Sequence, residues 1–195
     1  MIDLITLIHQ CAPNVAPSVL YATVRTESGF NPLALHINGA IRLQRPPKSA
    51  AEATAWSSWL IEHGYSVDLG LMQINSRNLA SLGLTPMEAF DPCQNVRAGA
   101  TLLAIGYARA ARSQGAGTQA LLQAISAYNT GDFHKGFNNG YVWKVVSGGA
   151  PGGSPGVTSE PERSLTRPAR GRVNSDRPDQ PYGAGTAVGG FGVAP

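Results

Sequence analysis

The sequence is poor in charge, in cysteine and in long apolar runs. Charged residues make up 14% of the 195 residues, and the net charge is +3. That excess is too small and too scattered to predict a nucleic-acid interface. No apolar run is long enough to predict a membrane span. The four histidines and two cysteines show neither metal-ligand spacing nor a CxxC pair, so neither a metal nor a cofactor is predicted.

The two cysteines, Cys11 and Cys93, leave two interpretations open. A disulfide would require an oxidising compartment such as the periplasm, whereas two buried free thiols would not. The apolar start of the chain does not decide between them. Residues 1–8 are apolar but short, and they carry Asp3 where a signal peptide would have basic residues. This segment fits a short helix packed on the core better than an export signal.

A change in composition divides the chain into two parts. Residues 147–195 consist mainly of Gly, Pro, Ser, Ala, Thr and Arg, with few large apolar side chains. Such a segment buries too little surface to offset the entropy of ordering, so we expect a disordered tail. The alternative is a small additional subdomain. The folded domain is therefore predicted to cover residues 1–146.

Helical spacing dominates residues 1–146, and no strand alternation is long enough to organise a sheet. Pro17 suits the first turn of a helix and Gly29 its end. Asp91 and Pro92 precede the longest helical pattern. Ser49 and Thr85 are each followed by glutamate three residues later, which is typical of a capping box. The predicted domain is mainly α, with helices near residues 17–28, 50–63, 72–82, 94–111, 118–128 and 141–146 and a short extended piece at 65–69.

Glu27 is the first candidate for catalysis, in the run Glu27-Ser28-Gly29-Phe30-Asn31-Pro32. It belongs to the last turn of a predicted helix, near the negative end of the helix dipole. That position favours the protonated form of a carboxyl group, which a general acid requires. The alternative is an ordinary solvated glutamate at a helix end.

Three further motifs follow in order: Gly-Leu-Met-Gln-Ile at 70–74, Ala-Tyr-Asn-Thr-Gly at 127–131, and Tyr-Val at 141–142. Together with the Glu27 run, they resemble the soluble lytic transglycosylase family over residues 10–146. The resemblance is closest to the branch that serves type IV secretion systems. That branch is indicated by Cys-Ala-Pro at 11–13, Thr-Glu-Ser-Gly-Phe-Asn-Pro at 26–32 and Asp-Pro-Cys-Gln-Asn at 91–95.

The resemblance implies a lysozyme-like α fold and an enzyme that acts on peptidoglycan. It would cut the β-1,4 bond between N-acetylmuramic acid and N-acetylglucosamine without water, leaving 1,6-anhydromuramoyl ends. It would open the cell wall locally for a secretion or conjugation apparatus, in the periplasm or cell envelope. Its expected partners are peptidoglycan strands and components of the secretion system. Because both cysteines fall in motifs of this branch, it also favours a Cys11–Cys93 disulfide.

By position in the motifs, Glu27 is the expected acid and base. The residues expected to contact substrate are Ser28, Met72, Gln73, Tyr128, Asn129 and Tyr141. Helix packing is the alternative for Met72, and a hydroxyl satisfied inside the protein is the alternative for the two tyrosines.

Other carboxylates and aromatic residues leave rival functions open. Asp68 is expected to cap a helix; in the cleft it would instead support a muramidase-type hydrolase with two carboxylates. Trp56 and Trp59 are expected to anchor their helix to the core, with sugar stacking as the alternative. The remaining alternative is a catalytically weak module that binds peptidoglycan and recruits secretion partners.

Overall fold

A computed structural model describes residues 3–148 of the chain. The predicted tail at 147–195 therefore lies outside the described residues, apart from its first two. The described part is mainly helical, as predicted. Its elements are α1 (Leu4–Cys11), α2 (Pro17–Ser28), β1 (Leu35–Ile37), α3 (Ala50–Glu62), β2 (Val67–Leu69), β3 (Ile74–Asn75), η1 (Ser76–Asn78), α4 (Leu79–Leu82), η2 (Glu88–Phe90), α5 (Pro92–Gln114), α6 (Thr118–Thr130), α7 (Lys135–Asn138) and α8 (Tyr141–Ser147).

The helices begin and end at the local signals of the sequence. Helix α2 starts with Pro17, and it ends at Gly29, whose φ of 59° is left-handed and whose N–H donates to the Arg25 carbonyl oxygen. Helix α5 is capped by the Asp91 carboxylate, which accepts from the backbone N–H of Gln94 at 2.8 Å. Ser49 likewise accepts from the N–H of Glu52 at the start of α3.

A small antiparallel sheet corrects two predictions. The strands follow the order β1-β2-β3, with His36 opposite Asp68 and Asp68 opposite Asn75. Asp68 lies within β2, is 5% exposed and accepts from Asn75 Nδ2 at 2.8 Å, so the expectation that it caps a helix is wrong. The predicted helix at 72–82 is also wrong before α4, because the chain first forms a turn, β3 and η1. These strands are too short to show an alternating pattern.

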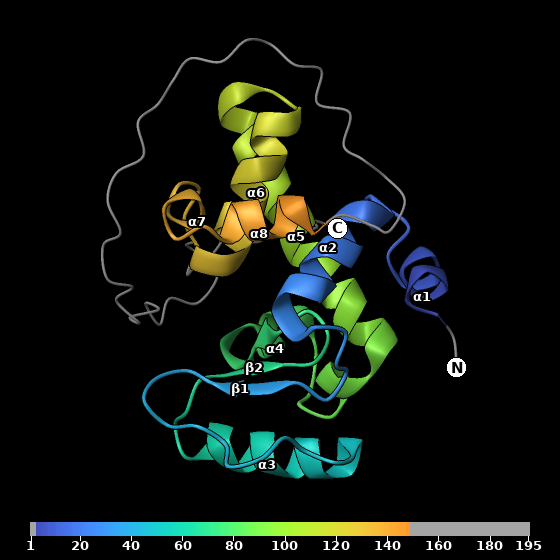
Figure 1. The fold of residues 1–195 in the computed structure, drawn as a ribbon, viewed down its shortest axis with the longest axis vertical. Coiled ribbons are helices and arrows are strands. Elements are labelled where there is room, and N and C mark those ends of the chain that lie inside the picture. Colours follow the sequence, from blue (N-terminus) through green and yellow to red (C-terminus); the bar gives the residue numbers. More distant parts are fainter. Residues whose placement is uncertain (1–2, 149–195) are drawn as a thin grey trace, which may run out of the picture.

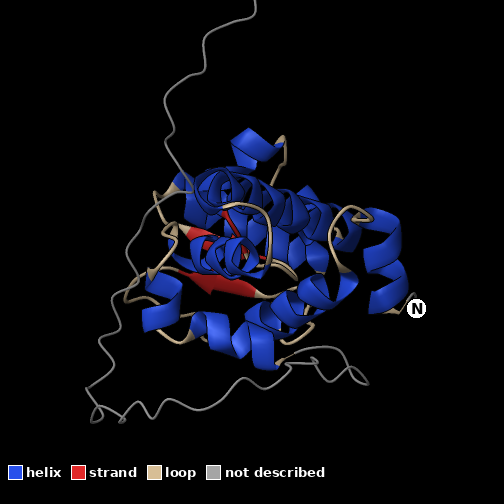
Figure 2. Cartoon of the chain, turned by 90° about the horizontal axis from the view of Figure 1, so that it is seen from above, coloured by secondary structure: helices blue, strands red, loops and turns tan. Residues whose placement is uncertain are grey.

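The long helix α5 connects the two ends of the fold. Figure 1 places the sheet and α3 at one end and α6, α7 and α8 at the other. Figure 2 shows helices on several sides of the sheet. Helix α5 packs against α1, α6 and β3. Fully buried apolar side chains from several elements form one core, including Ile8, Leu20, Leu69, Met72, Val96 and Val142. Within residues 3–148, no helix is both long and apolar enough to cross a membrane.

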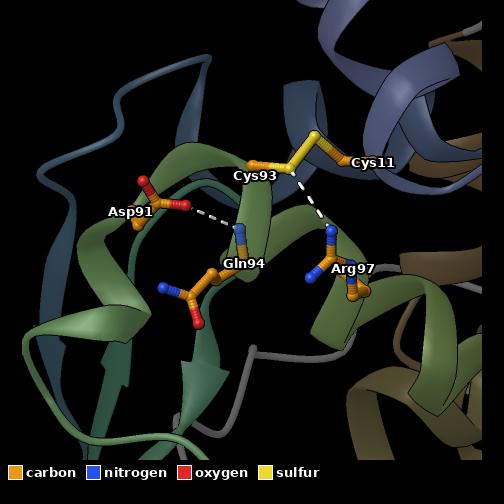
Figure 3. Close-up of a disulfide and its surroundings, with 5 residues drawn as sticks. All are labelled: Cys11, Asp91, Cys93, Gln94 and Arg97. Carbon is orange, nitrogen blue, oxygen red and sulfur yellow. Dashed lines mark hydrogen bonds between the residues drawn. A yellow bond between two sulfur atoms is a disulfide. The ribbon is translucent and has the colours of Figure 1, made fainter.

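The favoured disulfide is present and joins the end of α1 to the first turn of α5 (Figure 3). Cys11 and Cys93 are separated by 82 residues in sequence, and their Cα atoms lie 5.3 Å apart. A crosslink that closes so long a loop stabilises a fold by about 2–4 kcal/mol, mainly by restricting the unfolded chain. It fixes the start of α5 against α1.

Candidate active site

A polar cleft of about 320 Å³ brings together residues from both ends of the fold. Four of the predicted site residues line it: Glu27, Gln73, Asn129 and Tyr141. Four further residues of the cleft were not predicted from the sequence: Thr26, His36, Asn139 and Lys144. All eight side chains carry polar groups, as a cleft for a hydroxyl-rich ligand requires.

Glu27 is held by a tyrosine from the far end of the domain. The Tyr141 hydroxyl donates to Glu27 Oε1 at 2.5 Å, across 114 residues of sequence. Tyr141 is the first residue of α8 and is 7% exposed, so its ring is fixed in the core. Glu27 is half-buried at the end of α2. The carboxyl group therefore has a set orientation at the edge of the cleft, as a proton-transferring group needs.

Gln73 presents an oxygen to the cleft. Its Nε2 donates to the carbonyl oxygens of Ala34 at 3.1 Å and Gly70 at 2.9 Å. Because both partners are acceptors, the amide nitrogen must face them, which fixes the side-chain orientation. Both amide protons are then engaged, so Oε1 is the group that Gln73 can offer to a ligand. An acceptor at this position suits an acetamide N–H or a sugar hydroxyl.

Met72 and Tyr128, two of the predicted substrate contacts, are not among the residues that line the cleft. Met72 is 0% exposed, and a Cβ built on Gly99 would lie 2.5 Å from its Cε, so the side chain fills the core instead of meeting a sugar. The Tyr128 hydroxyl donates to the Met72 carbonyl oxygen at 2.6 Å. Tyr128 therefore supports the turn before Gln73.

Ser28 forms a hydrogen bond within its own helix. Its hydroxyl donates to the Val24 carbonyl oxygen at 3.2 Å, and it is not among the residues that line the cleft. The sequence pattern alone does not separate it from Glu27, because the two are neighbours in one motif. Only the direction of the side chain distinguishes them.

Asn129 and Asn139 form a pair on the cleft wall. Asn139 Nδ2 donates to Asn129 Oδ1 at 3.0 Å, and Asn139 Oδ1 accepts from the Tyr141 N–H at 2.9 Å. The Asn129 oxygen is thus engaged, which leaves its NH₂ group to donate to a ligand carbonyl. The pair links the end of α6 to the start of α8. Asn139 carried no sequence signal beyond its position two residues before Tyr141.

Glu27 is the only carboxylate among the described residues that line the cleft. Asp68 is buried in β2, where its carboxylate accepts a hydrogen bond from the Asn75 side chain. Asp132 accepts from the backbone N–H groups of His134 at 2.8 Å and Lys135 at 3.0 Å, and these bonds lower the pKa of Asp132. Within residues 3–148, no cluster of histidine, cysteine and carboxylate side chains could hold a metal ion.

The tryptophans of α3 do not line the cleft. Trp59 is 54% exposed and stacks on His63, with ring centroids 4.0 Å apart, so the expectation that it anchors α3 to the core is wrong. Trp56 is half-buried beneath the Arg45 guanidinium, whose central carbon lies 4.6 Å from the ring centroid.

Comparison with known proteins finds similarity over nearly all of the described residues. Residues 6–144 match the family model "Transglycosylase SLT domain". The chain is 43% identical over 160 residues to Protein virB1 of Agrobacterium fabrum (strain C58 / ATCC 33970), covering 82% of this chain and 64% of that protein. It is 40% identical over 167 residues to Type IV secretion system protein virB1 of Brucella abortus biovar 1 (strain 9-941), covering 83% and 67%.

The chain therefore spans about two thirds of the length of these relatives. No solved structure matches it at a significant level. The family model covers nearly all of the described residues and includes every residue of the cleft. On the family match, the sequence identity and the resemblance of its four motifs, the chain belongs to the family of transglycosylase SLT domains.

Proposed function

We propose that this protein is a peptidoglycan lytic transglycosylase in which Glu27 acts first as acid and then as base. The observation that carries the proposal is the single carboxylate of the cleft, oriented by the Tyr141 hydroxyl at 2.5 Å. A glycoside hydrolase of the usual kind needs two carboxylates flanking the scissile bond. A cleft with one carboxylate among its described lining residues fits a reaction in which the substrate supplies the other group.

Each proton in the proposed reaction has a defined donor and acceptor. Glu27 donates its proton to the glycosidic oxygen, and the bond from this oxygen to the anomeric carbon of the muramoyl sugar breaks. The acetamide oxygen of the same sugar stabilises the positive charge that develops there. The ionised Glu27 then takes the proton of the 6-hydroxyl group as this oxygen attacks the anomeric carbon. A 1,6-anhydro ring forms, and Glu27 regains its starting proton.

The neighbouring side chains suit the acetamide group of the substrate. The NH₂ group of Asn129 can donate to the acetamide oxygen, and Gln73 Oε1 can accept from an acetamide N–H. These assignments follow from which amide atoms the protein itself leaves available. They give Asn129 and Gln73 complementary roles, one as donor and the other as acceptor, while Tyr141 orients Glu27.

The proposed setting is the cell envelope, where the enzyme would open peptidoglycan for a type IV secretion system. The name of the Brucella relative, Type IV secretion system protein virB1, supports this setting. The disulfide between Cys11 and Cys93 supports an oxidising compartment, for which we propose the periplasm. Peptidoglycan strands and components of the secretion apparatus are the partners that follow from this assignment.

Digestion of purified peptidoglycan tests the proposal, with the product termini identified by mass spectrometry. We expect 1,6-anhydromuramoyl ends. Reducing ends would show hydrolysis and would contradict the lyase mechanism. Strand binding without soluble products would instead identify a binding module.

The substitution Glu27→Gln removes the transferable proton and keeps the shape of the side chain. We expect it to reduce product release at least about a thousandfold, because general acid–base catalysis contributes on this order. Glu62→Gln is the matched control, since Glu62 also ends a helix but is exposed and absent from the cleft lining. Near-normal activity of Glu27→Gln would refute the role of Glu27.

A further inference from the structure

The turn that carries Gln73 into the cleft has an unusual backbone. Gln73 has a φ of 48°, in the left-handed region that favours glycine, and Gly70 three residues earlier has a φ of 73°. A non-glycine residue in this region costs on the order of 1–3 kcal/mol and persists only where its surroundings hold it. The turn between β2 and β3 therefore depends on support from other elements.

Asn95, in the first turns of α5, supplies that support with its whole side-chain amide. Its Oδ1 accepts from the Met72 N–H at 2.7 Å, and its Nδ2 donates to the carbonyl oxygens of Leu69 at 2.8 Å and Ala89 at 2.7 Å. Asn95 is 1% exposed, so water does not compete for these bonds. One side chain thus holds the turn at both of its ends.

The turn also lies in direct contact with this amide. A Cβ built on Gly70 would come within 2.4 Å of Asn95 Nδ2 and 2.6 Å of the Ala89 carbonyl oxygen. Glycine at this position lets the backbone approach the amide closely enough for the two hydrogen bonds that join Asn95 to Leu69 and Met72. We propose that Asn95 is a positioning residue that places Gln73 against the sugar, an inference that rests on the proposed function.

The predicted kinetic signature follows from the position of Gln73. Asn95 does not line the cleft, so it acts on substrate only through the turn. Gln73 would bind a sugar in the ground state and in the transition state alike. Loss of such uniform binding raises KM and leaves kcat nearly unchanged. A defect of this kind differs from the loss of kcat expected for changes around Glu27.

Asn95→Asp is the most informative substitution. It keeps the size of the side chain and the acceptor for the Met72 N–H, but it places a carboxylate oxygen against the carbonyl oxygens of Leu69 and Ala89. Two acceptors facing each other repel, so the turn must shift. On soluble glycan strands we expect KM to rise about tenfold and kcat to change by less than about twofold.

A double-mutant cycle separates positioning from a purely structural role. KM is measured for wild type, Asn95→Asp, Gln73→Ala and the double variant, with thermal unfolding of all four. If Asn95 acts through Gln73, its substitution changes KM by less than about twofold once Gln73 is absent, although the loss of stability remains. An equal rise in KM in both backgrounds would overturn the proposal.

Two further variants complete the experiment. Asn14→Asp makes the same chemical change at an exposed position between α1 and α2, and we expect no change in KM. If Asn95→Asp does not fold, the cycle is run with Asn95→Ser, which removes the amide without placing a charge against the carbonyl oxygens of Leu69 and Ala89. Wild-type activity is the reference: absence of anhydro products would refute the proposed function, whereas an additive cycle with active wild type would refute the role of Asn95 alone.

Discussion

The two sides of the cleft are built in different ways. The Glu27 wall, formed by Thr26, Glu27, Tyr141 and Lys144, consists of helix ends whose boundaries have local sequence signals. The Gln73 wall, formed by His36 and Gln73, consists of a short strand and a strained turn held by residues far away in sequence. The difference indicates that the position of the proposed catalytic carboxylate follows from local sequence signals, whereas the proposed sugar-binding surface depends on contacts between distant residues.

The separation in sequence between the contacting residues explains this difference. On the Gln73 wall, the turn is held by Asn95 across 23 to 26 residues and by Tyr128 across 56 residues. On the Glu27 wall, Gly29 alone ends the helix that presents the carboxylate, through its left-handed conformation. The Glu27–Tyr141 bond is also long-range, but it joins two groups whose helix positions are already fixed.

The largest expected loss of stability comes from removing the disulfide that fixes the start of α5. We expect the double substitution Cys11→Ser and Cys93→Ser to lower the free energy of unfolding by about 2–4 kcal/mol, as measured by urea denaturation. Because Cys93 lies two residues before Asn95 in α5, KM should rise more than kcat falls under conditions where the variant remains folded. A reductant should destabilise wild type and leave the double variant unchanged; an equal effect on both would contradict this account.

The substitution Gly70→Ala changes the turn that forms the Gln73 wall. The new methyl group would meet Asn95 and the backbone of Ala89, so we expect a loss of about 2–3 kcal/mol in the free energy of unfolding. Gly64→Ala is the matched control, because Gly64 has a similar φ of 83° but no atom within 4 Å of the added Cβ. The difference between the two variants measures the close contact apart from the backbone strain. Equal losses would show that the contact matters little.

The difference between local and long-range contacts also explains which predictions from the sequence succeed. Pro17, Gly29 and Asp91 act on adjacent backbone groups, so the helix boundaries that they predict agree with the structure. The burial of Met72 and the pairing of Asp68 with Asn75 depend on contacts that helical spacing does not contain.

The resemblance to a family names the right motifs but not the direction of each side chain. It gives Ser28 and Tyr128 the same substrate-binding role as Gln73, although their hydroxyls donate to backbone carbonyl oxygens of the protein itself. His36 and Asn139 carry no signal of their own, because they reach the cleft only through strand pairing and the turn after α7.

Tyr141→Phe tests whether the Glu27 wall controls the chemical step. The substitution keeps the buried ring and removes the hydroxyl that orients the carboxyl group. We expect kcat to fall about 10- to 100-fold with KM within about twofold, since a poorly oriented acid slows proton transfer more than binding. Tyr65→Phe, at a half-buried position outside the cleft lining, should leave both constants unchanged. A rise in KM without loss of kcat would place Tyr141 with the binding residues instead.

The smallest expected effect concerns Lys144. This residue adds a positive charge to the Glu27 wall but has no part in the proposed proton transfer. It is exposed, it lies one helical turn after Tyr141, and its ammonium group makes no hydrogen bond or ion pair with any residue between 3 and 148. The peptides attached to muramoyl sugars carry carboxylates, which an ammonium group at the cleft attracts.

Exposed pairs of this kind contribute about 0.2–1 kcal/mol, so Lys144→Gln should raise KM for peptide-bearing strands by about 1.4- to fivefold at low salt. Strands from which an amidase has removed the peptides should show no change, and neither should Lys48→Gln, which makes the same change outside the cleft lining. If KM rose equally for stripped strands, the lysine would be contacting the sugars, and the charge of the peptides would play no part.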